Sequence, residues 1–201
     1  MQALRATTTG ANPKYRLDLA LPPEPFLGLH DAPLVTLLAN PGRSESDPAA
    51  YARPGITPRT LHNIATDGGT PNHFLSGAEP DHPGSLWWRR TLRGLTTLGH
   101  SYEELSRTVL ALQFHGYHSP EWRPIPFTLP SQSFTFDLVR RAMSRDAVII
   151  LGRIADVWTI AIPELRSYPN VVTPKTRRNA AISRGMFTPQ DFERITDALA
   201  V

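Results

Sequence analysis

The sequence predicts an α/β protein, a three-layer αβα sandwich in which a short, mostly parallel sheet of four strands lies between two layers of helices. Four short apolar runs have the length of buried strands, and helical patterns separate them along the chain. Such an alternation of strand and helix is typical of parallel sheets whose two faces are both covered. In these sheets a ligand binds beyond the carboxyl ends of the strands.

The predicted strands are short and apolar, and two of them end in residues with polar chemistry. The first strand stops at Asn40-Pro41-Gly42, because Pro and Gly interrupt a strand and turn the chain. The second strand, with the sequence TVLALQF, contains Gln113 close to its end. The predicted strands span residues 33–39, 108–114, 146–151 and 170–173.

Helices are predicted between these strands and after the last one. Ser101 and Glu104 have the spacing of a capping box, which begins a short helix before the second strand. Thr188 is the expected N-cap of the last helix, with Pro189 at its first position. Further helices are expected at residues 58–65, 85–98, 134–144 and 153–162.

The chain length of 201 residues suits one α/β domain and is too short for two domains of ordinary size. Residues 1–24 lack periodicity and are expected to form an N-terminal arm, and residues 25–201 are expected to form a single domain. Residues 43–83 are rich in Pro, Gly, Asp, His and Thr. A weakly structured segment of this length inside a domain is typical of a functional loop.

The composition excludes several classes of protein. Without cysteine the chain has no disulfide framework, thiolate metal site or cysteine nucleophile. It has no apolar run long enough to span a membrane and no secretory signal, so we expect a cytoplasmic monomer without a membrane partner. Of its 21 basic residues only Lys14 and Lys175 are lysines. Arginine suits phosphate recognition, although a G+C-rich genome would produce the same excess, and the net charge of +3 permits a nucleic-acid partner without requiring one.

The usual motifs of several enzyme classes are missing from the sequence. The first strand is not followed by GxGxxG, and the chain contains no GxxxxGK[ST] phosphate loop, GxSxG nucleophile elbow or HExxH. What remains near the strand ends are the amides of Asn40, Gln113 and Asn179 and the hydroxyl of Ser183. Amides can read the edge of a base and hold a water, and turn capping is the alternative role of each.

The segment that follows the first strand carries a family resemblance. Residues 37–42, LLANPG, resemble the G-[IM]-N-P-G first motif of the mismatch-specific and single-strand-selective branches of the uracil-DNA glycosylase superfamily, with Leu38 in place of the leading glycine. The resemblance covers roughly residues 24–200. It implies a glycosylase-like αβα fold in which Asn40 positions the hydrolytic water and Pro41 and Gly42 lie beside the base.

Further positions extend the resemblance around the base. Gln113 stands where the family has an asparagine that reads the pyrimidine edge, one methylene longer. The segment Tyr117-His118-Ser119 and residues 129–132 are similar to segments of bacterial relatives, which implies that Tyr117 and His118 also lie beside the base. Phe74, in the long loop, is our choice for the aromatic ring that stacks on it.

The second catalytic motif of the family, His-Pro-Ser or Asn-Pro-Ser, is similar to the stretch after the fourth strand. Asn179 matches its first residue, whereas Ala180 and Ala181 replace the Pro and Ser. The match implies that Asn179 is a second catalytic residue and that Ser183 contacts a phosphate from a shifted position. No metal and no organic cofactor are expected, because fixed hydrogen-bond donors facing the leaving base lower the barrier in such a site.

The partner implied by the resemblance is DNA, single- or double-stranded, from which the target nucleotide is swung out into a pocket. Basic side chains neutralise the phosphates of such a strand. A solvated basic loop is the alternative interpretation of the densest cluster near the second motif. The candidate DNA-binding residues are Lys175, Arg177, Arg178, Ser183 and Arg184.

The leading hypothesis is a DNA glycosylase that hydrolyses the N-glycosidic bond of uracil or a modified pyrimidine. The second is a non-catalytic nucleic-acid-binding module that has kept the fold and lost the chemistry, because the second motif lacks its Pro and Ser. The third is a hydrolase of free nucleosides or nucleotides, for which DNA affinity would be weak.

Overall fold

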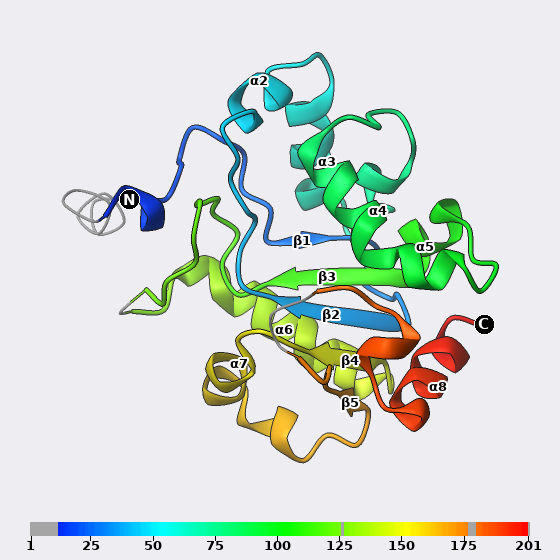
Figure 1. The fold of residues 1–201 in the computed structure, drawn as a ribbon. Coiled ribbons are helices and arrows are strands. Elements are labelled where there is room, and N and C mark those ends of the chain that lie inside the picture. Colours follow the sequence, from blue (N-terminus) through cyan, green and yellow to red (C-terminus); the bar gives the residue numbers. More distant parts are fainter. Residues whose placement is uncertain (1–11, 126, 177–179, 201) are drawn as a thin grey trace.

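The computed structural model describes residues 12–125, 127–176 and 180–200, and a sheet of five strands lies at the centre of this part (Figure 1). The strand order is β1-β3-β2-β4-β5; β2 to β5 run parallel, and β1 pairs with β3 in the antiparallel direction. The strands are β1 (Phe26–Leu27), β2 (Leu34–Leu38), β3 (Val109–Gln113), β4 (Val148–Leu151) and β5 (Val171–Val172).

The sheet is therefore mixed and five-stranded, and the prediction of four strands is wrong by one. The four predicted runs form β2 to β5, whereas β1 is only two residues long and carries no periodic signal. Gly28 ends β1 with a φ of 110°, and a Cβ there would lie 2.4 Å from the Val109 carbonyl oxygen. Glycine at this position allows the chain to lie close against β3.

Seven α-helices occur among the described residues, six of them at or near the predicted places, and α2 in addition. The capping box at Ser101 is confirmed, because the Ser101 hydroxyl accepts from the Glu104 amide and the Glu104 carboxylate accepts from the Ser101 amide. Thr188 caps the last helix, as predicted, by accepting from the Asp191 amide. The helices are α2 (Asp47–Tyr51), α3 (Ile56–Ala65), α4 (Pro83–Thr96), α5 (Tyr102–Thr108), α6 (Pro130–Ser144), α7 (Ala155–Ala161) and α8 (Pro189–Ala198), with 3₁₀ helices at Pro13–Tyr15, His73–Leu75, Pro163–Arg166 and Arg184–Met186.

Successive strand residues point to opposite faces of the sheet, and each face has its own apolar core. Val35 and Leu37 of β2 pack with residues of α6 and α7, among them the fully buried Trp158. Leu34 lies in the other core, with residues of α4, α5 and α8 such as Leu92. Helices therefore cover both faces, which is compatible with the predicted three layers.

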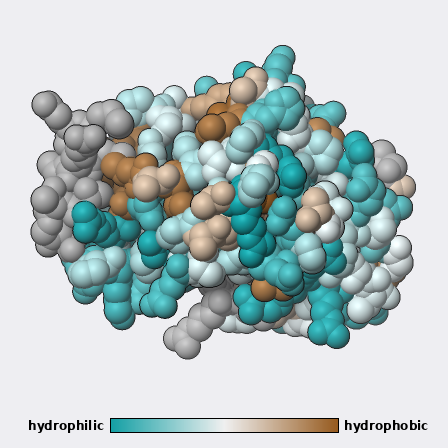
Figure 2. Space-filling model, turned by 90° about the horizontal axis from the view of Figure 1, so that it is seen from above, coloured by the Kyte–Doolittle hydropathy of each residue, from teal (hydrophilic) through white to brown (hydrophobic). Residues whose placement is uncertain are grey.

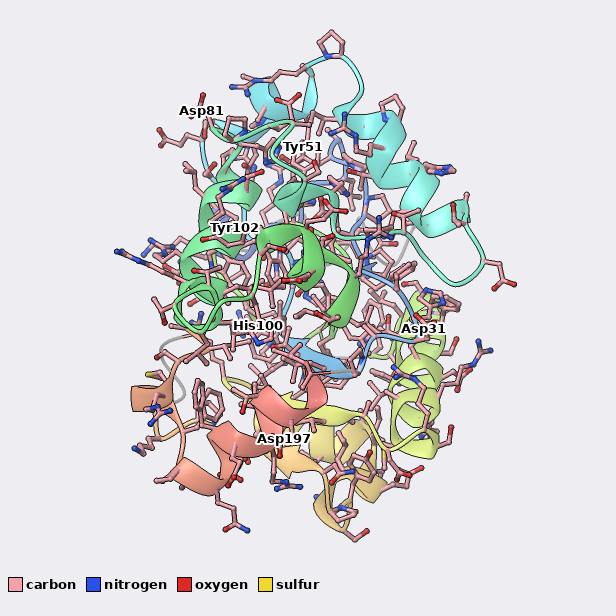
Figure 3. All side chains as sticks on the ribbon, turned by 90° about the vertical axis from the view of Figure 1, so that its right-hand side faces the viewer. Asp31, Tyr51, Asp81, His100, Tyr102 and Asp197 are labelled. Atoms are coloured by element: carbon pink, nitrogen blue, oxygen red, sulfur yellow. The ribbon has the colours of Figure 1, made fainter. Side chains whose placement is uncertain are left out.

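The helices on the second face are tied to one another by side chains as well as by apolar packing. The Tyr102 hydroxyl of α5 donates to the Arg89 carbonyl of α4 at 3.1 Å, and the Arg89 guanidinium lies 4.7 Å from the centre of the Tyr102 ring. Figure 3 views the molecule from the side on which the amino ends of the parallel strands lie, with Asp31, His100 and Tyr102 labelled. The carboxyl ends lie on the far side.

The long segment of residues 43–83 is more structured than its composition suggests. It contains the predicted helix α3 and also α2 and the turn His73–Leu75, which together cover one side of the sheet (Figure 1). The surface on this side is mostly hydrophilic, with hydrophobic residues in separate patches (Figure 2). Among the described residues, none of the helices has the length and apolar character needed to cross a membrane.

A close backbone contact fixes the last segment of the chain against α4. The Ile182 amide donates to the Thr91 carbonyl at 2.8 Å, and this places Ile182 and Ser183 directly over Gly94. A Cβ at Gly94 would lie 2.3 Å from the Ile182 carbonyl oxygen and 2.5 Å from the Ser183 Cβ. The contact therefore requires glycine in the middle of a helix.

We expect Gly94→Ala to lower the free energy of unfolding by about 1–3 kcal/mol, because the methyl group collides with backbone. Alanine normally stabilises a helix by about 1 kcal/mol relative to glycine. A decrease in the free energy of unfolding would therefore indicate the collision, because helix propensity alone would increase it. Urea unfolding measures it. Gly185→Ala, where a Cβ meets nothing within 4 Å, is the matched control and should change little. A Gly94→Ala protein as stable as wild type would show that the segment does not pack on α4.

Candidate functional site

A cavity of about 660 Å³ lies at the carboxyl ends of the central strands, on the face covered by α4. The strand residues that line it are Leu27 of β1, Thr36, Leu37 and Leu38 of β2, Gln113 of β3 and Ile150 of β4. The register pairs Leu38 with Gln113, so β2 and β3 end side by side. This is the edge at which the sequence predicts a ligand site.

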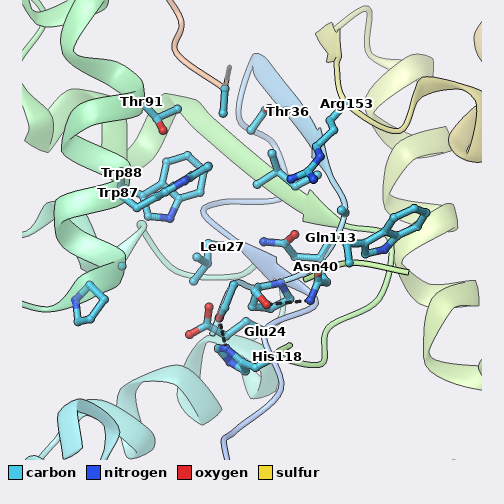
Figure 4. Close-up of a pocket in the computed structure, with 18 of the residues that line it drawn as sticks. Glu24, Leu27, Thr36, Asn40, Trp87, Trp88, Thr91, Gln113, His118 and Arg153 are labelled. Atoms are coloured by element: carbon cyan, nitrogen blue, oxygen red, sulfur yellow. Dashed lines mark hydrogen bonds between the residues drawn. The ribbon is translucent and has the colours of Figure 1, made fainter. Parts of the chain in front are cut away.

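Asn40 lies just after β2 and lines the cavity with a side chain in a fixed orientation (Figure 4). Its Nδ2 donates to the Pro41 carbonyl at 2.9 Å, the Tyr117 carbonyl at 3.1 Å and the Ser119 hydroxyl at 2.9 Å. Two of these partners are carbonyl oxygens, which only accept, so the NH₂ group and not the oxygen must face them. The Oδ1 atom has no hydrogen bond to a described residue and remains an acceptor for a ligand or water.

Gln113, at the end of β3, points its side-chain amide into the same cavity (Figure 4). The residue is only 5% exposed, its Oε1 is buried without a partner, and its side-chain amide makes no hydrogen bond to another described side chain or carbonyl. An unpartnered buried polar atom costs about 1–3 kcal/mol. A ligand with a hydrogen-bonding edge would remove that cost, so Gln113 is a candidate binding residue.

Glu24 is a cavity residue that the sequence analysis missed. It is 4% exposed and precedes β1, and the Tyr51 hydroxyl of α2 donates a short hydrogen bond to its Oε1. Burial raises the pKa of the Glu24 carboxyl, although the neighbouring His118 and the hydrogen bond from Tyr51 act in the opposite direction. The available signal was a single acidic residue in the apolar, proline-rich segment LALPPEPFLGL.

His118 lines the cavity as predicted, but its ring is held by the backbone. The residue is 2% exposed, its Nδ1 lies 2.9 Å from the Gly42 carbonyl and its Nε2 lies 3.1 Å from the Pro22 carbonyl. His118 therefore ties the N-terminal arm to the loop after β2. Tyr117 is not among the cavity-lining residues, and its carbonyl is what contacts Asn40.

Phe74 lines the cavity, but its ring is largely enclosed by the protein. It is 2% exposed and stacks on His82 at a centroid distance of 4.8 Å, and a Cβ on Gly84 would lie 2.9 Å from it. Burial lowers the pKa of His82, whose Nδ1 accepts from the Gly84 amide at 3.0 Å.

Two adjacent tryptophans of α4 also line the cavity. Trp87 is half-buried, and its ring meets that of Trp88 edge to face at a centroid distance of 4.8 Å.

The predicted second motif lies only partly in the described structure. Asn179, Arg177 and Arg178 lie outside the described residues. Ala180 and Ala181 line the cavity, so the segment does reach the site. Ser183, Arg184 and Lys175 are not cavity-lining residues, and the Arg184 guanidinium lies 5.9 Å from the Phe192 ring instead.

The basic residues at the cavity are Arg43, Arg90 and Arg153. Arg43 is paired with Asp18 of the N-terminal arm at 2.8 Å. Arg90 and Arg153 are exposed and come from opposite sides, α4 and the loop after β4. Within the described part of the chain, no three His, Asp or Glu side chains are placed so that they could hold a metal ion.

Replacing Asn40 by aspartate tests the orientation of its side chain. A carboxylate cannot donate to the Pro41 and Tyr117 carbonyls, so we expect Asn40→Asp to destabilise the protein by about 3 kcal/mol at pH 7. The folded state disfavours the charge and raises the pKa of the introduced carboxyl above its unfolded value of about 3.9. The destabilisation is therefore greatest above the folded pKa and shrinks as the pH falls towards that unfolded value.

Urea unfolding of the variant and of wild type at pH 7 and pH 5 measures this difference. Asn12→Asp is the control, because the Asn12 Oδ1 accepts from the Lys14 amide and an aspartate can do the same. Equal stability of Asn40→Asp and wild type at pH 7 would contradict the described orientation.

Comparison of the chain with family models, curated proteins and solved structures finds no match. Its function must therefore be inferred from the cavity itself. Among the described residues, that cavity combines the Asn40 side chain with an Oδ1 that has no hydrogen bond, a buried Gln113 Oε1 without a partner and the buried Glu24 carboxyl, near the carboxyl ends of parallel strands.

Proposed function

We propose that the protein is a DNA glycosylase, which hydrolyses the N-glycosidic bond between deoxyribose and a flipped-out uracil or modified pyrimidine. The observation that carries this proposal is the juxtaposition of Asn40 and Gln113 on adjacent strand ends. Asn40 presents a fixed acceptor to the cavity, and Gln113 presents a buried Oε1 that has no partner among the described residues. The Asn40 oxygen suits a bound water, and the Gln113 side chain suits the edge of a base.

The reaction builds positive charge on the sugar and negative charge on the leaving base. Asn40 has no useful pKa and holds the attacking water through Oδ1 instead of deprotonating it. The Gln113 side-chain amide donates to the base and stabilises the charge that develops there. Donors fixed in place before the reaction contribute most to such catalysis, because they need no reorganisation.

The fold and the first motif are compatible with this function. The parallel strands in the order β3-β2-β4-β5, with helices on both faces, are compatible with the three-layer fold of the uracil-DNA glycosylase superfamily. Asn40-Pro41-Gly42, which resembles the first motif of that superfamily, follows β2 and lines the cavity. The exposed Arg90 and Arg153 at opposite sides of the cavity suit the phosphates that flank a flipped nucleotide.

The test is base release from oligonucleotides that carry uracil, 5-hydroxymethyluracil or glucosylated 5-hydroxymethyluracil, followed by alkaline cleavage at the abasic sites. We expect wild type to release at least one of these bases. Asn40→Ala should reduce single-turnover release about 100-fold or more, because positioning the water is its contribution.

Asn170→Ala is the matched control for Asn40→Ala. This substitution also removes hydrogen bonds, which Asn170 makes with the Asp146 carbonyl and with Arg194. Asn170 precedes β5, the edge strand of the sheet, and lies outside the cavity lining. The Asn170→Ala variant should release the base at the wild-type rate. Release by Asn40→Ala at the wild-type rate, or no release by wild type from any of these oligonucleotides, would contradict the proposal.

A non-catalytic nucleic-acid-binding module is the second candidate, favoured by Ala180 and Ala181 at the cavity in place of Pro and Ser. It predicts salt-sensitive DNA binding without base release, and binding that Asn40→Ala leaves unchanged. Hydrolysis of free deoxyuridine with weak DNA affinity would instead point to a nucleoside hydrolase.

A further inference from the structure

Glu24 supplies an ionisable group to the cavity that the proposed reaction has not yet used. Tyr51 engages only its Oε1, and Oε2 has no hydrogen bond to a described residue. Glu24 lines the same cavity as Gln113 and Asn40 (Figure 4). Because burial raises the pKa of Glu24, the neutral acid persists to a higher pH than in water.

The backbone places Glu24 next to Gln113. The Gln113 backbone amide donates to the Pro25 carbonyl at 2.9 Å, and the Glu24 backbone amide donates to the Gly116 carbonyl at 2.8 Å. Pro25 is therefore the neighbour of Gln113 on the β1 side, with Glu24 one residue before it, and Asn40 follows the strand on the other side of β3. A base at Gln113 would therefore lie between the segment that carries Glu24 and the loop that carries Asn40, and all three residues line the same cavity.

The other acidic and imidazole groups of the cavity make hydrogen bonds or ion pairs. His82 keeps a buried Nε2 without a partner among the described residues, but burial lowers its pKa and favours the neutral ring, which is a poor proton donor. A proton donor to a bound base must have a free polar atom and must change its charge easily. His118 contacts the carbonyls of Gly42 and Pro22, His82 accepts from the Gly84 amide, Asp47 accepts from the Ser44 amide at 2.6 Å, and Glu121 pairs with Lys14 at 3.2 Å.

We propose that Glu24 is the general acid that protonates the base as it leaves, an assignment that rests on the proposed glycosylase function. The bond between C1′ and the base nitrogen breaks, and its electron pair goes to the base. The Glu24 carboxyl gives its proton to an oxygen of that base, while the water oxygen forms a bond to C1′. The proton that the water loses passes to solvent, and solvent reprotonates the Glu24 carboxylate, so the enzyme ends the cycle unchanged.

The test uses Glu24→Gln, which keeps the shape of the side chain and an acceptor for the Tyr51 hydroxyl but has no acidic proton. Single-turnover release of uracil should fall about 100-fold or more. Release of 5-fluorouracil from the same oligonucleotide should fall far less, because fluorine stabilises the departing anion and reduces its need for a proton. A structural disturbance would slow both substrates equally. Glu45→Gln, at an exposed position outside the cavity lining, is the matched control.

The pH dependence of wild type provides a second measurement that needs no variant. Since only the neutral acid donates, release of uracil falls as the pH rises through the raised pKa of Glu24, and release of 5-fluorouracil stays nearly level. The ionisable groups that face the carboxyl are Tyr51 and Asp47 of α2 and His118 of the loop after β3. A general effect of pH on the fold or on DNA binding would change both rates together, so the difference between the two bases reports on proton donation to the base.

The outcomes separate this assignment from the function on which it rests. Unchanged uracil release by Glu24→Gln, or equal slowing of the two bases, overturns the role of Glu24 and leaves the glycosylase proposal standing. Parallel pH profiles for the two bases in wild type overturn the role as well. Failure of wild type to release any base overturns both.

Discussion

The cavity depends on one side chain that holds two strand ends together. Asn40 follows β2, and its Nδ2 binds the Tyr117 carbonyl and the Ser119 hydroxyl of the loop after β3, which is distant in the sequence. The backbone continues the same contact, because the Phe114 amide donates to the Leu38 carbonyl at 3.0 Å and the His115 amide to the Ala39 carbonyl at 3.2 Å. The two loops therefore form one rigid wall, and the free Oδ1 of Asn40 has a defined direction.

This arrangement separates two kinds of chemistry along the edge of the sheet. On the β2 side the cavity offers a neutral, fixed acceptor that suits a water. On the β1 side it offers a buried carboxyl held by Tyr51, whose neutral form is favoured by burial. The unpartnered Gln113 side-chain amide lies between them. The proposed mechanism assigns base recognition to Gln113, water positioning to Asn40 and proton donation to Glu24, and these residues lie at or next to the ends of three neighbouring strands.

Local patterns in the sequence were sufficient to predict most of the fold. The strands β2 to β5, the capping box at Ser101 and the N-cap at Thr188 each depend on neighbouring residues, which a sequence displays directly. The strand β1 could not be predicted, because its pairing with β3 comes from a contact distant in sequence and its two residues show no period. Glu24 was missed for the same reason, since that pairing is what brings it to the cavity.

The candidate site was predictable where a motif coincided with a strand end. Asn40, Gly42, Gln113 and His118 all line the cavity, because the carboxyl ends of parallel strands converge there. Side-chain orientation was not predictable. Packing against His82 and Gly84 encloses Phe74, and Tyr117 contributes a carbonyl to the site. The exposed Arg90 and Arg153, which a surface charge count does not distinguish from other arginines, lie at the cavity.

The most direct test of the central claim is a crystal structure with DNA that carries a 2′-fluorinated deoxyuridine, whose glycosidic bond resists hydrolysis. The account predicts the flipped uracil in the cavity, with its edge hydrogen-bonded to the Gln113 side-chain amide and a water at roughly 3 Å from the Asn40 Oδ1. An empty cavity with the strand bound elsewhere, or a flipped base that contacts neither Asn40 nor Gln113, would contradict it.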